Sequence, residues 1–165
     1  MIIERINEAI PGAIESSHDF RGDKTIVVSL QKYFDVVKFI FSEGYQMMVD
    51  LTAVDWPDRQ PRCDLVAHFQ NLVSQERLRV KAPTAKGQPV PSITPIHRGA
   101  LWFEREVFDM FGIPFEGHPD LKRLMMWEGF QGHPLRKDFQ LDGGDAWCAL
   151  DMGASYSAGA KSLAE

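Results

Sequence analysis

The stretch 104–139 gathers the residue types that could carry out acid–base chemistry, bind an anion or contact another protein. It reads EREVFDMFGIPFEGHPDLKRLMMWEGFQGHPLRKDF. At 100° per residue, Arg105, Glu106 and Asp109 fall on one side of a helix, with the first and last of them four residues apart. Glu104 instead falls among apolar residues, where a carboxylate costs several kcal/mol unless it is paired or protonated.

Two interpretations of Glu104 follow from this position. It could be a catalytic acid with a raised pKa, or a structural anchor that holds the loop after the helix. We favour the anchor, because no nucleophile or base lies in the same motif. The candidate partners for its charge are Arg123, Arg136, or an Arg or Lys of another chain.

A Gly-His-Pro pattern occurs twice, around His118 and around His133. Two histidines could bind a metal, but the helical spacing of a zinc motif is absent and the prolines oppose it. We therefore predict structural histidines that donate hydrogen bonds to loop carbonyls.

Basic and aromatic residues are mixed along the same stretch, which includes Arg123, Arg136 and Lys137. Such a mixture could bind a phosphate or nucleic acid. The formal net charge is nevertheless −5, and the chain has no Gly-rich phosphate loop. Arginine and aromatic side chains are also what the cores of protein interfaces favour. The stretch is therefore predicted to be a protein interface.

The composition argues against several other classes. The chain has 165 residues, 25% charged and 44% hydrophobic, which suits one globular domain with or without an extension. No apolar run approaches the ~20 residues that cross a bilayer, and acids among the first apolar residues argue against a signal peptide. Cys63 and Cys148 lie far apart, so we expect free thiols and no metal site. No Walker, GxGxxG, GxSxG or HExxH pattern occurs.

The periodicity predicts the elements that must position these residues. A helix, a hairpin, a second helix, three strands and a final helix indicate an α+β fold, with a small mixed or antiparallel sheet and flanking helices. We expect the odd-numbered residues 47–53 to share a buried strand face, and Phe34, Val37 and Phe41 to line the buried side of the second helix. The expected helices cover 2–10, 31–43 and 96–111, and the expected strands cover 13–20, 25–30, 46–55, 62–72 and 77–82.

The chain is expected to divide after Gly112. Residues 1–112 would form the α+β domain, with a Pro/Gly-rich surface connector at 83–91. Residues 113–165 would form an extended, irregular segment that docks on partner subunits. We also expect this segment to be poorly ordered in the isolated chain, because its polar and aromatic groups would await another subunit.

Three blocks of this sequence resemble a known family. They are Glu104-Arg105-Glu106-x-x-Asp109-x-Phe111-Gly112-Ile113, then Gly117-His118-Pro119-Asp120-Leu121-x-Arg123-Leu124, then Gly129-Phe130-Gln131-Gly132-His133-Pro134-Leu135-Arg136-Lys137-Asp138-Phe139. Together they resemble the C-subunit, also called the 30-kDa-type subunit, of the proton-pumping NADH:quinone oxidoreductase, respiratory complex I. The similarity is strongest over 102–139 and looser through the N-terminal part. Met126 and Gln140 are minor departures from the family pattern.

The resemblance implies a peripheral-arm subunit that packs on the hydrogenase-like D-subunit, near the iron–sulfur B- and I-subunits. It would hold no cofactor and no catalytic residue of its own, whereas the whole complex carries FMN, iron–sulfur clusters and quinone. It would lie on the cytoplasmic side of the bacterial inner membrane, and its docking or structural residues would be Glu104, Arg105, Glu106, Asp109, Phe111, His118, Asp120, Arg123, His133, Arg136, Lys137 and Asp138.

Two alternatives remain open at this stage. The first is the equivalent subunit of a membrane-bound hydrogenase, or of an F420- or ferredoxin-dependent quinone or methanophenazine oxidoreductase. The second is a stand-alone hydrolase that uses Glu104 with His118 or His133.

Overall fold

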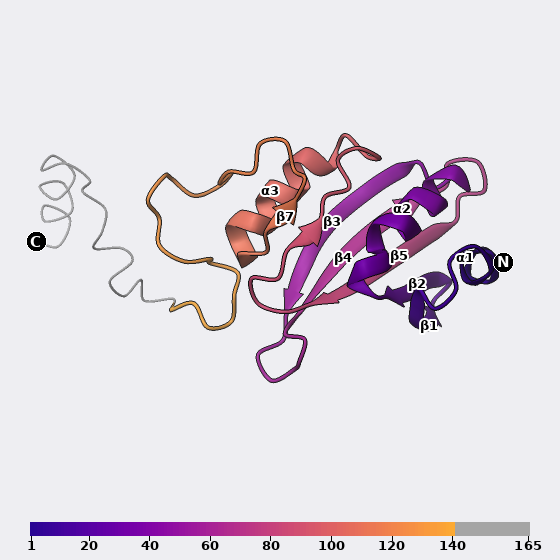
Figure 1. Cartoon of the computed structure of the whole chain (residues 1–165), viewed down its shortest axis with the longest axis horizontal. Helices are drawn as coiled ribbons and strands as arrows, with labels where there is room; N and C mark the ends of the chain where they lie inside the picture. Colours follow the sequence, from indigo (N-terminus) through magenta and orange to yellow (C-terminus); the bar gives the residue numbers. More distant parts are fainter. Residues whose placement is uncertain (141–165) are drawn as a thin grey trace, which may run out of the picture.

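The computed structural model describes residues 1–140 and has an α+β architecture (Figure 1). The predicted fold class is confirmed. Predictions made for 141–165, including the free thiol of Cys148, fall outside the described residues. The elements are α1 (Ile2–Ala9), β1 (Ile14–Phe20), β2 (Asp23–Val28), the short 3-10 helix η1 (Leu30–Lys32), α2 (Tyr33–Ser42), β3 (Met47–Asp55), β4 (Cys63–Gln70), β5 (Arg77–Thr84), β6 (Val90–Pro91), α3 (Ala100–Phe111) and β7 (Phe115–Glu116).

The main sheet has five strands in the order β1-β2-β5-β4-β3. β2 and β5 are parallel and the other neighbours are antiparallel, so the sheet is mixed. Alternation along β4 and β5 sends one set of side chains into the core. That set comprises Cys63, Leu65, Ala67, Phe69, Leu78, Val80 and Ala82, all buried.

α2 lies across one face of this sheet (Figure 1). The turn before α3 is on the same face, because the His97 ring lies 5.1 Å from both the Phe41 ring of α2 and the Phe69 ring of β4. The buried stripe of α2 differs from the predicted one: Val37 is buried, but Phe34 and Phe41 are only partly buried. Two overlapping stripes satisfy helical spacing here, and the sheet covers the one made by Tyr33, Val36, Val37 and Ile40.

The predicted alternation of β3 is correct at its end and wrong at its start. Leu51 is buried, but Met47 and Val49 are exposed. The pairing of β3 with β4 shifts between Met48 and Asp50, which leaves an extra residue in β3. Such a bulge reverses which side chains face the core, and Met48 packs against the core in place of Met47.

Two other boundaries differ from those predicted. α3 begins at Ala100 and not at residue 96, because the 93–97 backbone forms a separate turn in which the N–H of His97 donates to the carbonyl of Ile93. The 83–91 connector is shorter than expected, since β5 continues to Thr84 and β6 starts at Val90. β6 pairs in parallel with β7, which ties the connector to the residues after α3. No helix among residues 1–140 is long and apolar enough to cross a membrane.

The core position Leu65 offers a test of this sheet. Its side chain is fully buried in the middle of β4, so Leu65→Ala should lower the free energy of unfolding by about 2–5 kcal/mol through lost burial and a residual cavity. Val73→Ala, at a side chain 96% exposed, should change it by no more than about 0.5 kcal/mol. Urea unfolding followed by circular dichroism measures both, and equal effects of the two variants would contradict the assigned core.

Candidate functional site

The Asp109 carboxylate of α3 is the main point at which the chain after Gly112 is held. Its Oδ1 accepts a hydrogen bond of 2.6 Å from Arg123, and its Oδ2 accepts three from the backbone N–H groups of 124–126, at 3.0, 2.7 and 2.8 Å. The carboxylate is fully buried. One side chain therefore fixes both a cation and a tight turn of backbone.

These donors set the ionisation of Asp109. Burial acts to raise the pKa of its carboxyl, but the hydrogen bonds from Met126, Met125, Arg123 and Leu124 together outweigh burial and hold the pKa below its usual range. A folded-state pKa below the unfolded one contributes stability at pH values above the ordinary value of 3.8. That contribution is lost as the pH falls through the folded-state pKa.

Arg105 holds the same stretch from one helical turn earlier on the same side of α3. Its Nε donates to the carbonyl of Lys122 at 3.1 Å, and its second terminal nitrogen donates to the carbonyl of Arg123 at 2.9 Å. Its guanidinium also lies 5.2 Å from the centre of the Trp102 ring. Arg105 and Asp109, which the sequence placed at helical spacing, thus each bind the segment that follows.

Both predicted histidines bind backbone carbonyls, although these carbonyls belong to α3 and not to a loop. His118 Nε2 lies 3.1 Å from the carbonyl oxygen of Leu101, and His133 Nδ1 lies 2.9 Å from that of Asp109. A carbonyl only accepts, so each ring nitrogen donates. Within residues 1–140 no cluster of three or more His, Cys, Asp or Glu residues has the arrangement of a metal site.

Gly112 permits the close approach of His133. It ends α3 with φ +74°, a left-handed conformation that favours glycine. A Cβ at this position would lie 2.5 Å from the His133 ring. Any side chain here would therefore clash with His133, in addition to straining the backbone.

A second carboxylate, that of Asp55 at the end of β3, holds the chain near Lys137, at the far end of residues 113–140. Arg62 donates to both of its oxygens, at 2.6 and 2.8 Å, and the backbone N–H of Lys137 donates to Oδ2 at 2.8 Å. Arg62 also reaches Asp138 at 3.0 Å, and Arg136 donates two 3.0 Å hydrogen bonds to that carboxylate. The hydrogen bond from Arg62 is the largest of the effects that lower the pKa of Asp55.

Glu104 is buried as predicted, but the predicted pairing with Arg123 or Arg136 is wrong. Its carboxylate accepts hydrogen bonds of 2.7 Å from the Ser92 hydroxyl and from the Ile93 N–H. It therefore holds the turn before α3 and not the loop after it. Burial without a cation raises the pKa of this carboxyl to about 7. Because the side chain has no exposed surface and accepts its hydrogen bonds inside the fold, this position favours the structural anchor over the catalytic acid.

The remaining predicted residues occupy ordinary positions. Phe111 belongs to the hydrophobic core, and Glu106 is partly exposed on α3. Asp120 is exposed, pairs with Lys122 at 2.9 Å, and donates its backbone N–H to His118.

Several apolar side chains remain exposed on α3 and on the segment fastened to it. Trp102 is 57% exposed, and Met125 is 63% exposed. The ring of Trp127 meets that of Phe130 edge to face at 4.8 Å, and Phe130 stacks on Phe139. We call Trp102, Met125, Trp127 and Leu135 the apolar surface; all four are exposed.

The sequence reasoning missed Asp55, Arg62 and Ser92. A signal for Asp55 was present, since the alternation that turns Leu51 and Ala53 inward also turns Asp55 inward. An acid on the buried face of a strand requires a partner. No comparable signal marked Ser92, which directly follows β6 in the turn before α3.

Comparisons with known proteins agree on one family. The family model described as "Respiratory-chain NADH dehydrogenase, 30 Kd subunit" matches residues 26–145. The C-subunit of NADH-quinone oxidoreductase from Rhodobacter capsulatus is 46% identical over 136 residues, which cover 81% of this chain and 68% of the relative. The subunit of the same name from Caulobacter vibrioides has the same identity and coverage.

Two solved structures are similar in fold. A trypsin-resistant fragment of Nqo5 superimposes with a TM-score of 0.65 and 26% identity, covering 73% of this chain and 100% of the fragment. A chain of the membrane-bound sulfane sulfur reductase, an archaeal respiratory membrane complex, gives a TM-score of 0.71 and 29% identity, covering 85% of this chain and 84% of its own.

Asp109→Asn tests the first anchor. The change leaves the positive charge of Arg123 without its partner, so the free energy of unfolding should fall by about 3 kcal/mol. Amide hydrogen exchange at residues 124–126 should accelerate, because their acceptor loses its charge. Asp120→Asn, at an exposed carboxylate, is the matched control and should change stability by less than about 1 kcal/mol. Unchanged exchange at 124–126 would show that Asp109 does not hold this turn.

Glu104→Gln tests the buried carboxyl. The folded-state pKa of about 7 lies above the ordinary 4.5, so the native state binds the extra proton between these values. The free energy of unfolding of the unaltered chain should therefore fall by up to about 3 kcal/mol as the pH rises from 4.5 to 7. Glu104→Gln should remove this fall, whereas Glu128→Gln, at an exposed carboxylate, should keep it. Parallel stability–pH curves for Glu104→Gln and the unaltered chain would refute the raised pKa.

Proposed function

Because the chain belongs to the 30-kDa subunit family of respiratory-chain NADH dehydrogenase, as the C-subunit of NADH-quinone oxidoreductase, we propose that it supports the quinone-reducing module of that complex by packing on the hydrogenase-like D-subunit. Its partners are other subunits of the complex. The finer assignment, to the D-subunit with the iron–sulfur B- and I-subunits nearby, is part of the proposal.

The observation that carries this proposal is the apolar surface. Its residues are two tryptophans, a methionine and a leucine, exposed on a helix and on a segment that is hydrogen-bonded to that helix. Aromatic and Met side chains are enriched at interface cores, and exposed apolar patches mark sites of association. In this proposal most of the docking residues expected from the sequence do not contact the partner themselves. Arg105, Asp109 and Arg123 instead hold in place the segment that carries the apolar surface.

The polar groups of 113–140 need no other subunit to satisfy them. Asp109, Asp55 and the α3 carbonyls provide partners within the chain. The reason to expect poor order in the isolated chain is thereby removed for these residues. We propose that residues 113–140 are already ordered when they meet the partner subunit. We also propose that the division into 1–112 and 113–165 separates a sheet domain from a docking segment.

In this proposal the chain contributes support and not chemistry. FMN, iron–sulfur clusters and quinone would be held by other subunits, and the chain would lie with them on the cytoplasmic side of the bacterial inner membrane. Glu104, the carboxyl with the raised pKa, accepts from Ser92 and Ile93 inside the fold. That arrangement supports a structural role.

The likeness to the sulfane sulfur reductase chain favours a second candidate, the equivalent subunit of a respiratory complex with another electron donor. The 46% identity to subunits of NADH-quinone oxidoreductases favours the first. Affinity purification of the tagged chain from membranes distinguishes them. An NADH-binding flavoprotein among the co-purified subunits would support the first candidate, and its absence from an otherwise intact complex would support the second.

Charge placed on the apolar surface tests the docking proposal. Met125→Glu and Trp102→Glu should each lower the amount of chain found in the assembled complex about tenfold or more, because the interface would have to bury an unpaired carboxylate. Leu72→Glu, at an exposed apolar residue in the β4–β5 turn, is the control and should assemble normally. Native gels of solubilised membranes measure assembly, and NADH:quinone turnover is measured per assembled complex. Normal assembly with lost turnover would contradict a supporting role.

A further inference from the structure

The sheet face opposite α2 carries a row of cations on its central strand. Since Leu78 and Val80 of β5 face the core, Arg77, Arg79 and Lys81 point to the other face. No helix within residues 1–140 covers this face: α2 and the His97 turn that precedes α3 pack on the other one (Figure 1). The row therefore lies on an open surface.

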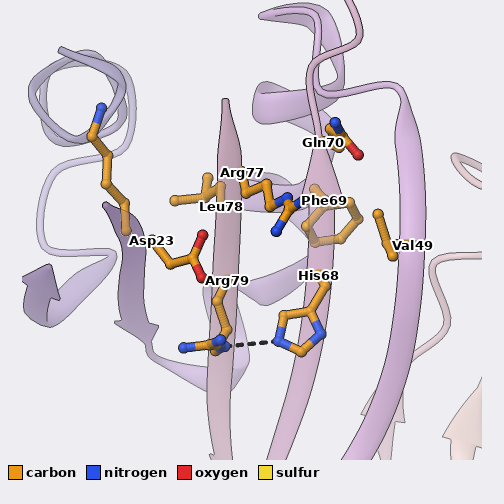
Figure 2. A pocket seen from close by; sticks show the side chains of 9 residues that line it. Asp23, Val49, His68, Phe69, Gln70, Arg77, Leu78 and Arg79 are labelled. Atoms are coloured by element: carbon orange, nitrogen blue, oxygen red, sulfur yellow. Dashed lines mark hydrogen bonds between the residues drawn. The ribbon is translucent and has the colours of Figure 1, made fainter. Parts of the chain in front are cut away.

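Arg79 is held in place by its neighbours on the adjacent strands. Its Nε donates to His68 Nε2 at 2.7 Å (Figure 2). One terminal nitrogen donates to the Thr25 hydroxyl at 3.1 Å. Since Nε2 of His68 accepts, that ring is neutral. The pKa of His68 is lowered, chiefly by burial and next by the charge of Arg79, and this lowering agrees with a neutral ring. The remaining terminal nitrogen of Arg79 stays available at the surface.

The two outer cations of the row are unpaired in this part of the chain. The side chains of Arg77 and Lys81 make no hydrogen bond or ion pair with any residue in 1–140. By contrast, Lys24 beside them is paired with Glu76 at 3.0 Å. A recess of about 340 Å³ opens next to the row, with Val49, Gln70 and Arg77 among its lining residues (Figure 2).

The spacing of the row defines its ligand. Cations at every second residue of a strand repeat at about 6.6 Å, which is also the repeat of alternate side chains in an extended peptide. Asp23 and Asp50 flank the row, on β2 and β3. They would repel the dense phosphates of a lipid surface or a nucleic acid, but they leave room for a single line of carboxylates above β5.

We infer that this row binds an extended acidic segment of another subunit of the complex, with carboxylates at alternate positions. Arg79 supplies a fixed donor at the centre, Arg77 and Lys81 pair with acids on either side, and the recess at Val49 accepts a side chain of the same segment. This contact lies on the opposite side of the sheet from α2, away from the apolar surface. It rests on the proposed function only in that the chain must be part of a complex.

Charge reversal tests this inference. The double variant Arg77→Glu, Lys81→Glu should release the chain from the purified complex at lower NaCl concentration, with at least about tenfold weaker retention at physiological salt. The double variant Lys38→Glu, Arg98→Glu changes the net charge equally at exposed positions and should behave like the unaltered chain. Circular dichroism of each purified chain checks folding, because the altered side chains are on the surface.

A photo-crosslinker at position 81 identifies the occupant. A cross-link to an acidic stretch of another subunit would support the inference. A cross-link to lipid, with binding to phosphatidylglycerol-containing vesicles that the double variant loses, would overturn it in favour of a membrane contact. If the double variant is retained normally while Met125→Glu is not, the acidic-segment inference fails and the proposed function stands. If neither variant alters retention, both fail.

Discussion

The buried Asp109 carboxylate is the constraint on which the C-terminal half of the described chain depends. A carboxylate without exposed surface must be supplied with donors, because water cannot reach it. Four donors from one short stretch satisfy it, and three of them are backbone N–H groups. The stretch 123–126 can therefore take only one path across α3, and that path decides where the exposed Met125 points.

Asp55 repeats the same arrangement at the other end of the segment. It lies on β3, yet it accepts from Lys137, so the sheet and the last described residues form one unit. Arg62 and Asp138 extend this contact outward. Hydrogen bonds to charged groups contribute more than those between neutral ones. The two carboxylates therefore add to the burial of Ile113, Phe115 and Phe130 in holding an irregular segment on the fold.

Periodicity was sufficient to predict the sheet and helices, because burial on one face leaves its pattern in the sequence. It predicted the burial of Leu51 on β3 and of Glu104 on α3. It failed at Met47, where the bulge that turns Met48 inward leaves no pattern in one strand alone. It also failed for the partner of Glu104, since a hydrogen bond to the Ile93 backbone is independent of side-chain identity and is not recorded in the sequence.

The internal pairing of these polar groups changes what an interface here requires. If Asp109 and Arg105 waited for another subunit, association would have to offset the cost of ordering the whole segment. Because both are already bonded within the chain, that ordering is completed on folding. Binding then costs little beyond the lost freedom of two bodies. Trp102 links the exposed surface to the hydrogen bonds that hold the fold. Its ring contacts Arg105, and Arg105 donates to the stretch of chain that carries Met125. A residue that fixes the fold, Arg105, and a residue that we propose contacts a partner, Trp102, are therefore neighbours on one helix.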